Sequence, residues 1–440
     1  MDEEAPLADR AEAVAWWREP TRPQWITFLA AWAGWVLDAF DFTIFLLAMP
    51  DIARTFGVSS VATASSITLT LVVRLAGGLC AGWAADRFGR RLPLVVSIVW
   101  FALCDGAVAF APTFGWVLVL RTLFGFGMGA EWTAGATLAM ESWPERSRGI
   151  ASGILQGSWA VGYILAALGY AWIAPRFGWQ ALFLAAALPA LLALPIRLWV
   201  PESREWSADA PGRAGVTLAD LRSEKVILRV AWASVLWGAT FAVYYGLTGM
   251  WSTLLRQELG LAPREVAWLA IAFNLGMLAG AIGWGRMVSR RGALWALGLP
   301  LALLVPALPL HVGAWTAGGA FVGSIPNGLW PGAFLAGAFG AGTCGVTPLV
   351  LTSLFPARVR AVSVGAVYQM AALLAAPTPA LVAWLHDRQG VSWPIAMGSV
   401  VGAAALLSLA ILLVRPAGAL PESALRGTMP GVAPAREAAG

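Results

Sequence analysis

Charged residues are scarce in this chain. Lysine, arginine, aspartate and glutamate make up 12% of its 440 residues, whereas hydrophobic residues make up 59% and the mean hydropathy is +0.72. Soluble domains carry about 25% charged residues and are less apolar. The composition therefore excludes an ordinary soluble domain and predicts an integral membrane protein.

Cysteine and histidine are also rare. The three cysteines, Cys80, Cys104 and Cys344, lie within long apolar runs, so we expect buried small residues and neither a disulfide nor a metal set. The two histidines, His311 and His386, lie near the outer ends of their runs and are poor candidates for a proton relay. No metal-ligand spacing, nucleophile elbow or nucleotide loop occurs. We therefore expect no enzyme activity, no cofactor and no metal.

Long apolar runs fill most of the sequence. A membrane-spanning helix needs about 20 mostly apolar residues. Twelve runs reach that length, namely 25–49, 61–85, 92–111, 114–141, 149–174, 179–199, 228–254, 264–288, 293–312, 327–353, 361–385 and 392–414. The sequence predicts an all-α integral membrane protein with twelve transmembrane helices.

The basic residues are unevenly distributed between the connections. The two tails and the even-numbered connections hold 22 of them, and the odd-numbered connections hold 5. The positive-inside rule then places both termini in the cytoplasm of a protein of the cell membrane. The net charge of +5 is explained by this bias, so we expect no nucleic-acid partner. The predicted organisation is a cytoplasmic tail 1–24, a six-helix half 25–200, a cytoplasmic linker 201–226, a second six-helix half 227–414 and a cytoplasmic tail 415–440. We expect the first tail to be retained and not cleaved as a signal peptide.

The second half repeats the first. The turn at residues 82–89 has a degraded copy 203 positions later, at residues 285–292. The segment PERSRGIASG at 144–153 recurs 212 positions later as PARVRAVSVG at 356–365. Such internal repeats are common in transporters, so two homologous, pseudo-symmetric six-helix halves are predicted.

Five ionisable residues lie at mid-depth in the spans of the first half. They are Asp38, Asp41, Arg74, Asp105 and Glu131. A charge in hydrocarbon is costly unless it faces a partner or a watery cavity, so these positions are candidate functional residues. We expect the four acids to lie at a depth similar to that of Arg74 and to be the candidates for proton coupling.

Arg74 has two interpretations. A buried guanidinium can bind a carboxylate through two charge-assisted hydrogen bonds. Alternatively, Arg74 pairs with Asp38, Asp41 or Glu131 and holds helices together. The second half has uncharged polar groups at similar depth, including Tyr245, Thr343 and Tyr368. We expect Arg74, Tyr244, Asn274 and Gln369 to contact the substrate. The alternative for each single polar side chain is that it only forms a hydrogen bond between helices.

Glycines and a basic turn follow Arg74. Gly125, Gly127 and Gly129 are typical of close helix packing, since no strand precedes them and no Lys-Ser/Thr follows. The turn GWAADRFGRR is typical of a tight cytoplasmic connection. We predict that it controls switching between inward- and outward-facing states. The residues assigned to gating are Gly82, Asp86, Arg87, Gly89 and Arg90, together with Arg121.

The motifs GWAADRFGRR, RTLFGFGMG and PESREW resemble those of the major facilitator superfamily across residues 25–414. Within it, WAGWVLDAFDF, VVRLAGG, GAEW and ESWPERSRGIASG resemble the sialate:proton symporter family, which includes lactate permeases. The resemblance implies proton-coupled uptake of an organic anion by a monomer in the lipid bilayer, with Asp38, Asp41, Arg74 and Glu131 at the recurrent polar positions. The linker 201–226 is shorter than the central insertion of sialate carriers.

Other functions remain open. An aromatic-acid:proton symporter and an exporter of hydrophobic compounds would share the fold, and a non-transporting membrane sensor is a third class. An exporter would favour an acid without a carboxylate-binding arginine, which Arg74 argues against. A sensor should carry a folded cytoplasmic output domain, which the short tails do not supply. The first expectation is a transporter of a small monocarboxylate resembling lactate or sialate.

Overall fold

The computed structural model describes residues 15–58, 60–89, 91–198, 226–251, 254–255, 258–261, 263–314, 321–322, 325–326, 328–356 and 359–414. Nearly all of the predicted linker and most of both predicted tails lie outside these residues. The domain boundaries expected there remain predictions.

The first half consists of long helices. They are α1 (Arg22–Phe56), α2 (Ser60–Phe88), α3 (Arg91–Val108), α4 (Phe114–Ser142), the 3-10 turn η2 (Glu145–Ser147) and α5 (Arg148–Leu198). The fifth and sixth predicted spans both lie in α5, which is broken at Gly178 with φ 79° and ψ 170°. A residue with a side chain would be strained at that φ, so glycine allows the chain to turn back without a longer loop.

The second half has shorter, more interrupted elements. They are α7 (Val226–Thr248), α9 (Pro263–Arg291), α10 (Ala293–His311), β1 (Phe321–Val322), β2 (Ile325–Pro326), α11 (Leu329–Phe339), the 3-10 helix η4 (Ala341–Val346), α12 (Thr347–Leu354), α13 (Arg360–Ala375), α14 (Thr378–Gln389) and α15 (Trp393–Leu413). The tenth predicted span is α11, η4 and α12 in succession, and the eleventh is α13 and α14. The break before α14 occurs at Pro377, which has no N–H for the helix ladder. The predicted loop 313–326 contains an antiparallel pairing of β1 with β2, which we did not predict.

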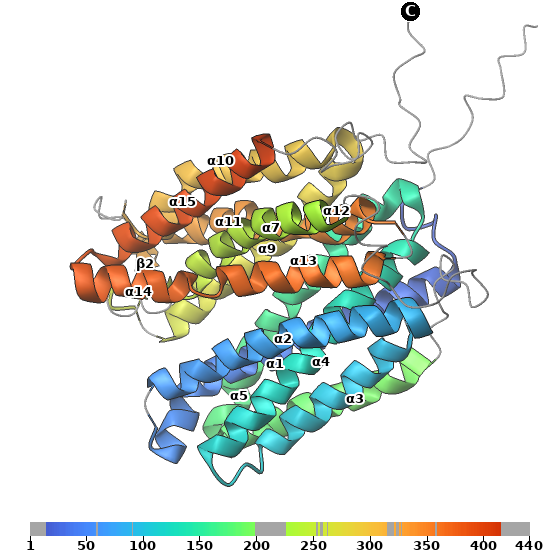
Figure 1. Cartoon of the computed structure of the whole chain (residues 1–440). Coiled ribbons are helices and arrows are strands. Elements are labelled where there is room, and N and C mark those ends of the chain that lie inside the picture. The colour runs from blue at the N-terminus through green and yellow to red at the C-terminus, as the bar shows by residue number, and fades with distance from the viewer. Residues whose placement is uncertain are drawn as a thin grey trace, which may run out of the picture.

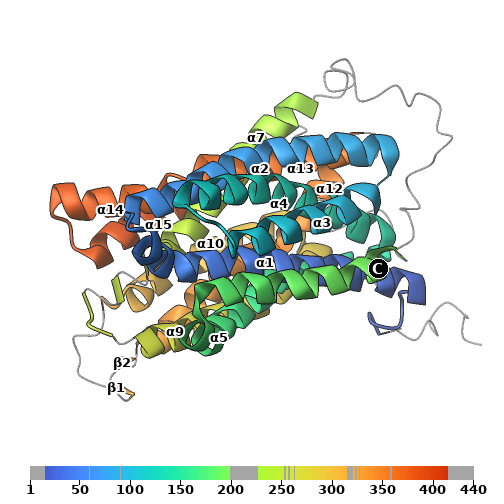
Figure 2. The same cartoon turned by 90° about the horizontal axis from the view of Figure 1, so that it is seen from below.

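Helices occupy all twelve predicted spans. Within the described residues, eight helical segments are long and apolar enough to cross a membrane, and shorter apolar helices lie at Leu69–Ala85, Val95–Val108 and Phe114–Gly129. The long helices run approximately parallel in Figure 2, as expected for a multi-pass membrane protein. The twelve-helix fold predicted from the sequence is confirmed.

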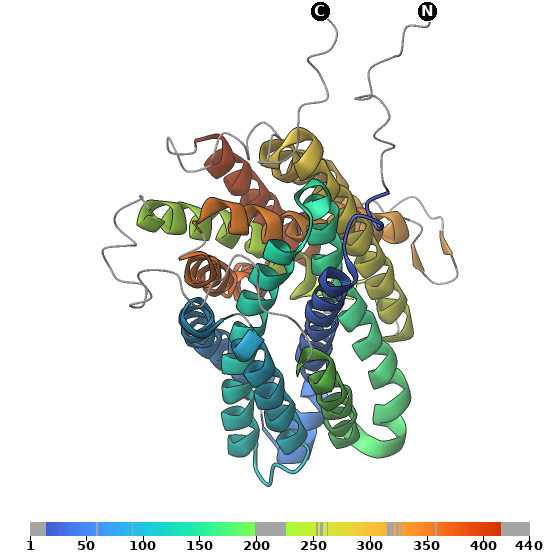
Figure 3. The same cartoon turned by 90° about the vertical axis from the view of Figure 1, so that its right-hand side faces the viewer.

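The two halves form separate bundles of similar construction. Figure 1 shows the blue-to-green helices of the first half below the yellow-green-to-red helices of the second, and Figure 3 shows the same bundles nearly end-on. Gly125 of α4 packs against the backbone of Thr70 in α2, and Gly337 of α11 packs against Phe273 in α9. These paired positions are offset by 212 and 203 residues, the offsets of the sequence repeat.

The repeated PERSR and PARVR segments also have equivalent contacts. Arg148 Nε donates to the carbonyl oxygen of Trp143 at 2.9 Å, and Arg360 Nε donates to that of Phe355 at 3.1 Å. Arg360 and Phe355 lie 212 positions after Arg148 and Trp143, respectively. The repeat is therefore structural as well as sequential.

Glycines bring helices into direct backbone contact. Gly125 and Gly129 lie against α2, which supports the packing interpretation. Across the interface, Gly153 of α5 lies against Ala281 of α9, and Gly82 of α2 lies against Val362 of α13. A side chain at any of these positions would displace the neighbouring backbone.

One hydrophobic core joins the halves at the end where α1 begins. It contains Phe28 and Trp143 from the first half with Val226, Val288 and Leu412 from the second. A separate cluster at the opposite end of the first half includes Ile52 and Trp179. The first helix begins and the last helix ends in the shared core, so both described ends of the chain lie on one side of the molecule.

The cysteine prediction was partly wrong. Cys104 and Cys344 are buried, but Cys80 is exposed, and all three are free. Cys80 belongs to an exposed stripe of α2 that includes Leu69, Val72, Leu79 and Trp83. In a membrane protein an apolar outer face meets lipid, so a small apolar residue is suited to the exposed surface as well as to the core.

Candidate functional site

A narrow cavity lies between the two halves. Its volume is about 40 Å³, enough for a few water molecules. The lining comes from α1, α2 and α5 on one side and α7, α9, η4 and α13 on the other. The lining residues are Phe42, Arg74, Gln156, Trp159, Phe241, Tyr244, Tyr245, Met277, Cys344 and Tyr368.

Arg74 faces this cavity from α2. It is 3% exposed, and its guanidinium carbon lies 5.4 Å from the centre of the Tyr368 ring. Its Nε and Nη2 have no hydrogen-bond partner among the residues that the structure describes. The side chain of Glu131, one of the predicted partners, lies outside those residues. Arg74 is therefore a buried cation with donor atoms left to bind an anion.

Three acids of the first half, Asp38, Asp41 and Asp105, are buried, and none of them is among the lining residues of the cavity. Asp38 and Asp41 are both buried on α1, as expected for charged residues within a membrane span. Asp105 of α3 accepts a hydrogen bond from Arg121 of α4, with 2.6 Å between Oδ1 and Nη1, and both side chains are at most 1% exposed. Asp41 interacts electrostatically with Asp38, Asp105 and Arg121. Arg121 therefore lies among the acids predicted for proton coupling. The sequence analysis had assigned it to gating, together with the basic turn.

The predicted polar residues of the second half differ in position. Tyr244 lines the cavity and accepts a hydrogen bond from Trp159 Nε1 at 3.2 Å. Asn274 instead donates to Ala270 of its own helix at 2.8 Å. Gln369 donates across the interface to the carbonyl oxygen of Gly129 at 3.4 Å. Neither Asn274 nor Gln369 is among the residues that line the cavity.

The cavity is lined by aromatic residues that were not predicted as site residues, although Tyr368 had been noted as a polar group at similar depth. Phe42, Trp159, Phe241 and Tyr368 line the cavity. The repeat offers a signal for one of them, since Phe241 stands 203 positions after Asp38 and Tyr244 stands 203 positions after Asp41. Tyr244 was predicted as a substrate contact, whereas Phe241 was not. Phe42 and Trp159 resemble ordinary apolar helix residues in sequence.

The basic turn lies at the end where the halves share a core. Gly82 packs against α13, and Gly89 has φ 98°, which ends α2 in a backbone conformation suited to glycine. Arg87 is exposed, and its guanidinium lies over the rings of Trp83 and Phe88 at 5.5 and 5.6 Å. The side chain of Asp86 and the whole of Arg90 lie outside the described residues.

An ion pair that we did not predict joins the halves at the same end. Arg360 Nη1 at the start of α13 lies 3.0 Å from Glu141 Oε1 near the end of α4. Nearby, Ser152 of α5 donates to the carbonyl oxygen of Gly345 at 2.7 Å and accepts from the N–H of Leu349 at 3.1 Å. This end is closed by polar contacts as well as by the shared core.

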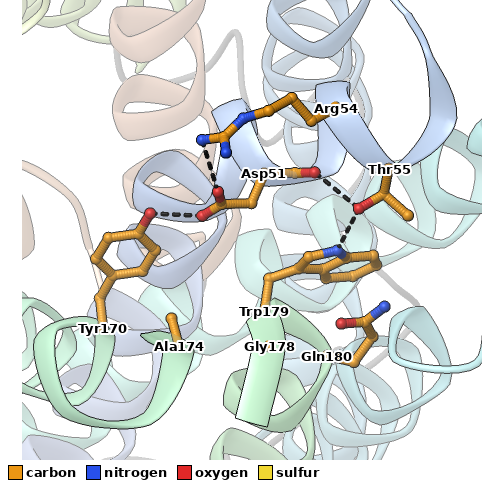
Figure 4. A pocket seen from close by; sticks show the side chains of 8 residues that line it. All are labelled: Asp51, Arg54, Thr55, Tyr170, Ala174, Gly178, Trp179 and Gln180. Atoms are coloured by element: carbon orange, nitrogen blue, oxygen red, sulfur yellow. Dashed lines mark hydrogen bonds and ion pairs between the residues drawn. The ribbon is translucent and has the colours of Figure 1, made fainter. Parts of the chain in front are cut away.

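A second hollow lies at the opposite end of the first half, between α1 and the bend of α5, with a volume of about 490 Å³. Figure 4 shows Asp51 accepting hydrogen bonds from Arg54 at 3.0 Å and Tyr170 at 2.5 Å, while Trp179 donates to Thr55 at 2.9 Å. The bonds from Tyr170 to Asp51 and from Trp179 to Thr55 join α5 to α1. None of the predicted site residues lines this hollow.

Comparison with known proteins identifies the family. Residues 31–255 match the Major Facilitator Superfamily. The chain is 34% identical to the "Probable 4-methylmuconolactone transporter" of Cupriavidus pinatubonensis over 56% of its own length and 58% of that protein. It is 29% identical to the cis,cis-muconate transport protein of Acinetobacter baylyi, covering 86% of this chain and 91% of the relative.

Two further comparisons support the resemblance to the sialate:proton symporter family and the predicted fold. The chain is 26% identical to the sialic acid transporter NanX of Escherichia coli, with 90% of this chain and 96% of the relative covered. Its fold resembles that of the proton:xylose symporter XylE, with a TM-score of 0.72 at 19% identity, covering 89% and 94% of the two chains. These relatives are transporters and not enzymes, in agreement with the sequence prediction. The chain therefore belongs to the Major Facilitator Superfamily.

Proposed function

We propose that this secondary transporter takes up a small organic anion together with protons. The observation that carries the proposal is Arg74, a buried guanidinium beside a cavity between the two halves. Planar carboxylate and guanidinium groups form two parallel hydrogen bonds. The named transporters of muconate and sialic acid show that organic acids are substrates of related proteins.

The structure favours the binding interpretation of Arg74 over helix bracing. A bracing arginine should make hydrogen bonds to the acids around it, because a buried charge without such partners is costly. Within the described side chains, Nε and Nη2 of Arg74 have none, whereas Arg121 is bonded to Asp105. An incoming carboxylate would provide the missing acceptors.

The acids near Arg121 support proton coupling. Asp105 is bonded to the guanidinium of Arg121, whereas neither carboxylate oxygen of Asp41 has a hydrogen-bond partner among the described residues, and all three side chains have almost no exposure. Two carboxylates and one guanidinium leave a net negative charge there, and burial favours neutralising that charge with a proton. We propose that the proton is carried within this group, with Asp38 and Glu131 as further candidates on α1 and α4.

Transport requires the halves to rearrange. A cavity of about 40 Å³ is far below the roughly 300–1,000 Å³ of small-molecule sites, so it must widen to admit a substrate. We propose that the closed end with Glu141 and Arg360 is cytoplasmic, as are both termini and the linker, and that the protein lies in the cell membrane. The turn containing Gly82, Asp86 and Arg87 would then act at the inner gate.

Uptake by purified protein in lipid vesicles tests this function. Lactate, sialate, benzoate and dicarboxylates are offered with and without an inward proton gradient. We expect at least one carboxylate to accumulate above its equilibrium level only when the gradient is present. Failure to carry any organic anion in correctly inserted, folded protein would contradict the proposal.

A further inference from the structure

The walls of the central cavity are mainly aromatic. Six of its ten lining residues carry an aromatic ring, namely Phe42, Trp159, Phe241, Tyr244, Tyr245 and Tyr368. Aromatic faces and edges offer large contact areas with a preferred geometry, in contrast to flexible aliphatic walls. The lining is therefore better suited to a flat molecule than to a puckered one.

Neighbouring rings fix the plane of Tyr368. Its ring stacks on Trp132, with 3.5 Å between centroids and 18° between planes. Trp132 stacks in turn on Trp35 at 5.3 Å and 15°. Phe241 meets Tyr368 nearly edge-on, at 4.9 Å and 78°. Because Trp35 and Trp132 are 1% exposed, this column is held by the core and presents Tyr368 to the cavity in a set orientation.

The charge of the cavity limits the substrate further. Arg74 is the one charged residue in the described lining, and its guanidinium carbon lies over the Tyr368 ring, 5.4 Å from the ring centre. A single carboxylate matches this cation. A second carboxylate on the same molecule would be desolvated without a cation of its own. The uncharged polar groups of the lining are Gln156 and the hydroxyls of Tyr244, Tyr245 and Tyr368, and Tyr244 is already bonded to Trp159, which leaves few partners for a polyhydroxylated acid.

We propose that the substrate is a planar, conjugated monocarboxylate, an inference that rests on the proposed function. Its carboxylate binds Arg74, and its π system packs against Tyr368 and the surrounding rings. Conjugation keeps a carboxylate coplanar with its ring or diene, so both groups can be engaged at once by a guanidinium and a ring of fixed orientation. Tyr368 is then the residue that determines selectivity for flat substrates.

Three acids of similar size test this selectivity in the vesicle assay. Benzoate is planar with one carboxylate, cyclohexanecarboxylate is its saturated counterpart, and terephthalate adds a second carboxylate. We expect the wild type to carry benzoate with a kcat/KM about two- to twelvefold higher than that of cyclohexanecarboxylate, equivalent to the 0.5–1.5 kcal/mol contribution of an aromatic pair. Terephthalate should be the poorest substrate.

Tyr368→Leu should remove the preference for benzoate, whereas Tyr368→Phe, which keeps the ring, should retain it. Phe241→Leu is a second test if Tyr368→Leu does not fold, and it should reduce the preference. Equal transport of benzoate and cyclohexanecarboxylate by the wild type would overturn the inference and leave anion transport intact. An undiminished preference in Tyr368→Leu would overturn the role of Tyr368. Absence of transport for every carboxylate would overturn the proposed function as well.

Discussion

The ion pair between Glu141 and Arg360 should control how readily the halves separate at their closed end. Its atoms lie 3.0 Å apart, and the side chains are 1% and 17% exposed. Glu141→Gln keeps the shape of the side chain and removes the charge. A hydrogen bond between charged groups contributes about 1.5–3 kcal/mol. Because Arg360 is not fully buried and keeps its hydrogen bond to the carbonyl oxygen of Phe355, we do not add the larger cost of an isolated buried charge.

The expected result is a shift toward the state in which this end is open. A loss of about 1.5–3 kcal/mol from the closed state alone raises the open-to-closed ratio about 10- to 150-fold. Val362, which packs on Gly82 across the interface, is replaced by cysteine after Cys80, Cys104 and Cys344 have been removed. Labelling of Val362→Cys by a membrane-impermeant maleimide from the cytoplasmic side should accelerate in the Glu141→Gln background.

Glu145→Gln is the matched control. Glu145 lies 3.8 Å from Arg148 within the first half, and its side chain is 46% exposed, so its loss should leave the equilibrium nearly unchanged. Exchanging the charges, with Glu141→Arg and Arg360→Glu together, should restore slow labelling. Equal labelling rates for Glu141→Gln and the wild type would refute the argument that this ion pair closes the interface.

Three further predictions address binding, coupling and topology. Arg74→Lys should insert and fold but bind the transported anion about 1.5–3 kcal/mol more weakly in a thermal-shift titration. If the variant keeps full affinity, Arg74 does not bind the carboxylate of the substrate. Asp41→Asn or Asp38→Asn should abolish uptake driven by a proton gradient while sparing substrate exchange, and retained uphill uptake in both would transfer the role to another acid. Labelling of cysteines introduced in 201–226 and 313–326 should report opposite sides of the membrane, whereas one shared side would contradict the twelve-span topology.

The sequence determined the fold to a large extent, since membrane helices are specified locally. A span requires a continuous apolar run because its backbone polar groups must be satisfied within the helix, and all twelve runs contain helix. The offsets of 203 and 212 residues likewise predicted equivalent packing, as Gly125 and Gly337 show. Arg74 and Asp41 also stand out in the sequence by itself, because burying a charge in an apolar helix is costly.

The tertiary structure decided which of these groups meet. Sequence could not show that Arg121 is bonded to Asp105, because the partner choice depends on how α3 and α4 are rotated against each other. It also could not separate Tyr244, which faces the cavity, from Asn274, which bonds its own helix. Both are single polar residues in apolar helices. Their difference arises from the packing of whole helices, which brings together residues that are far apart in the chain.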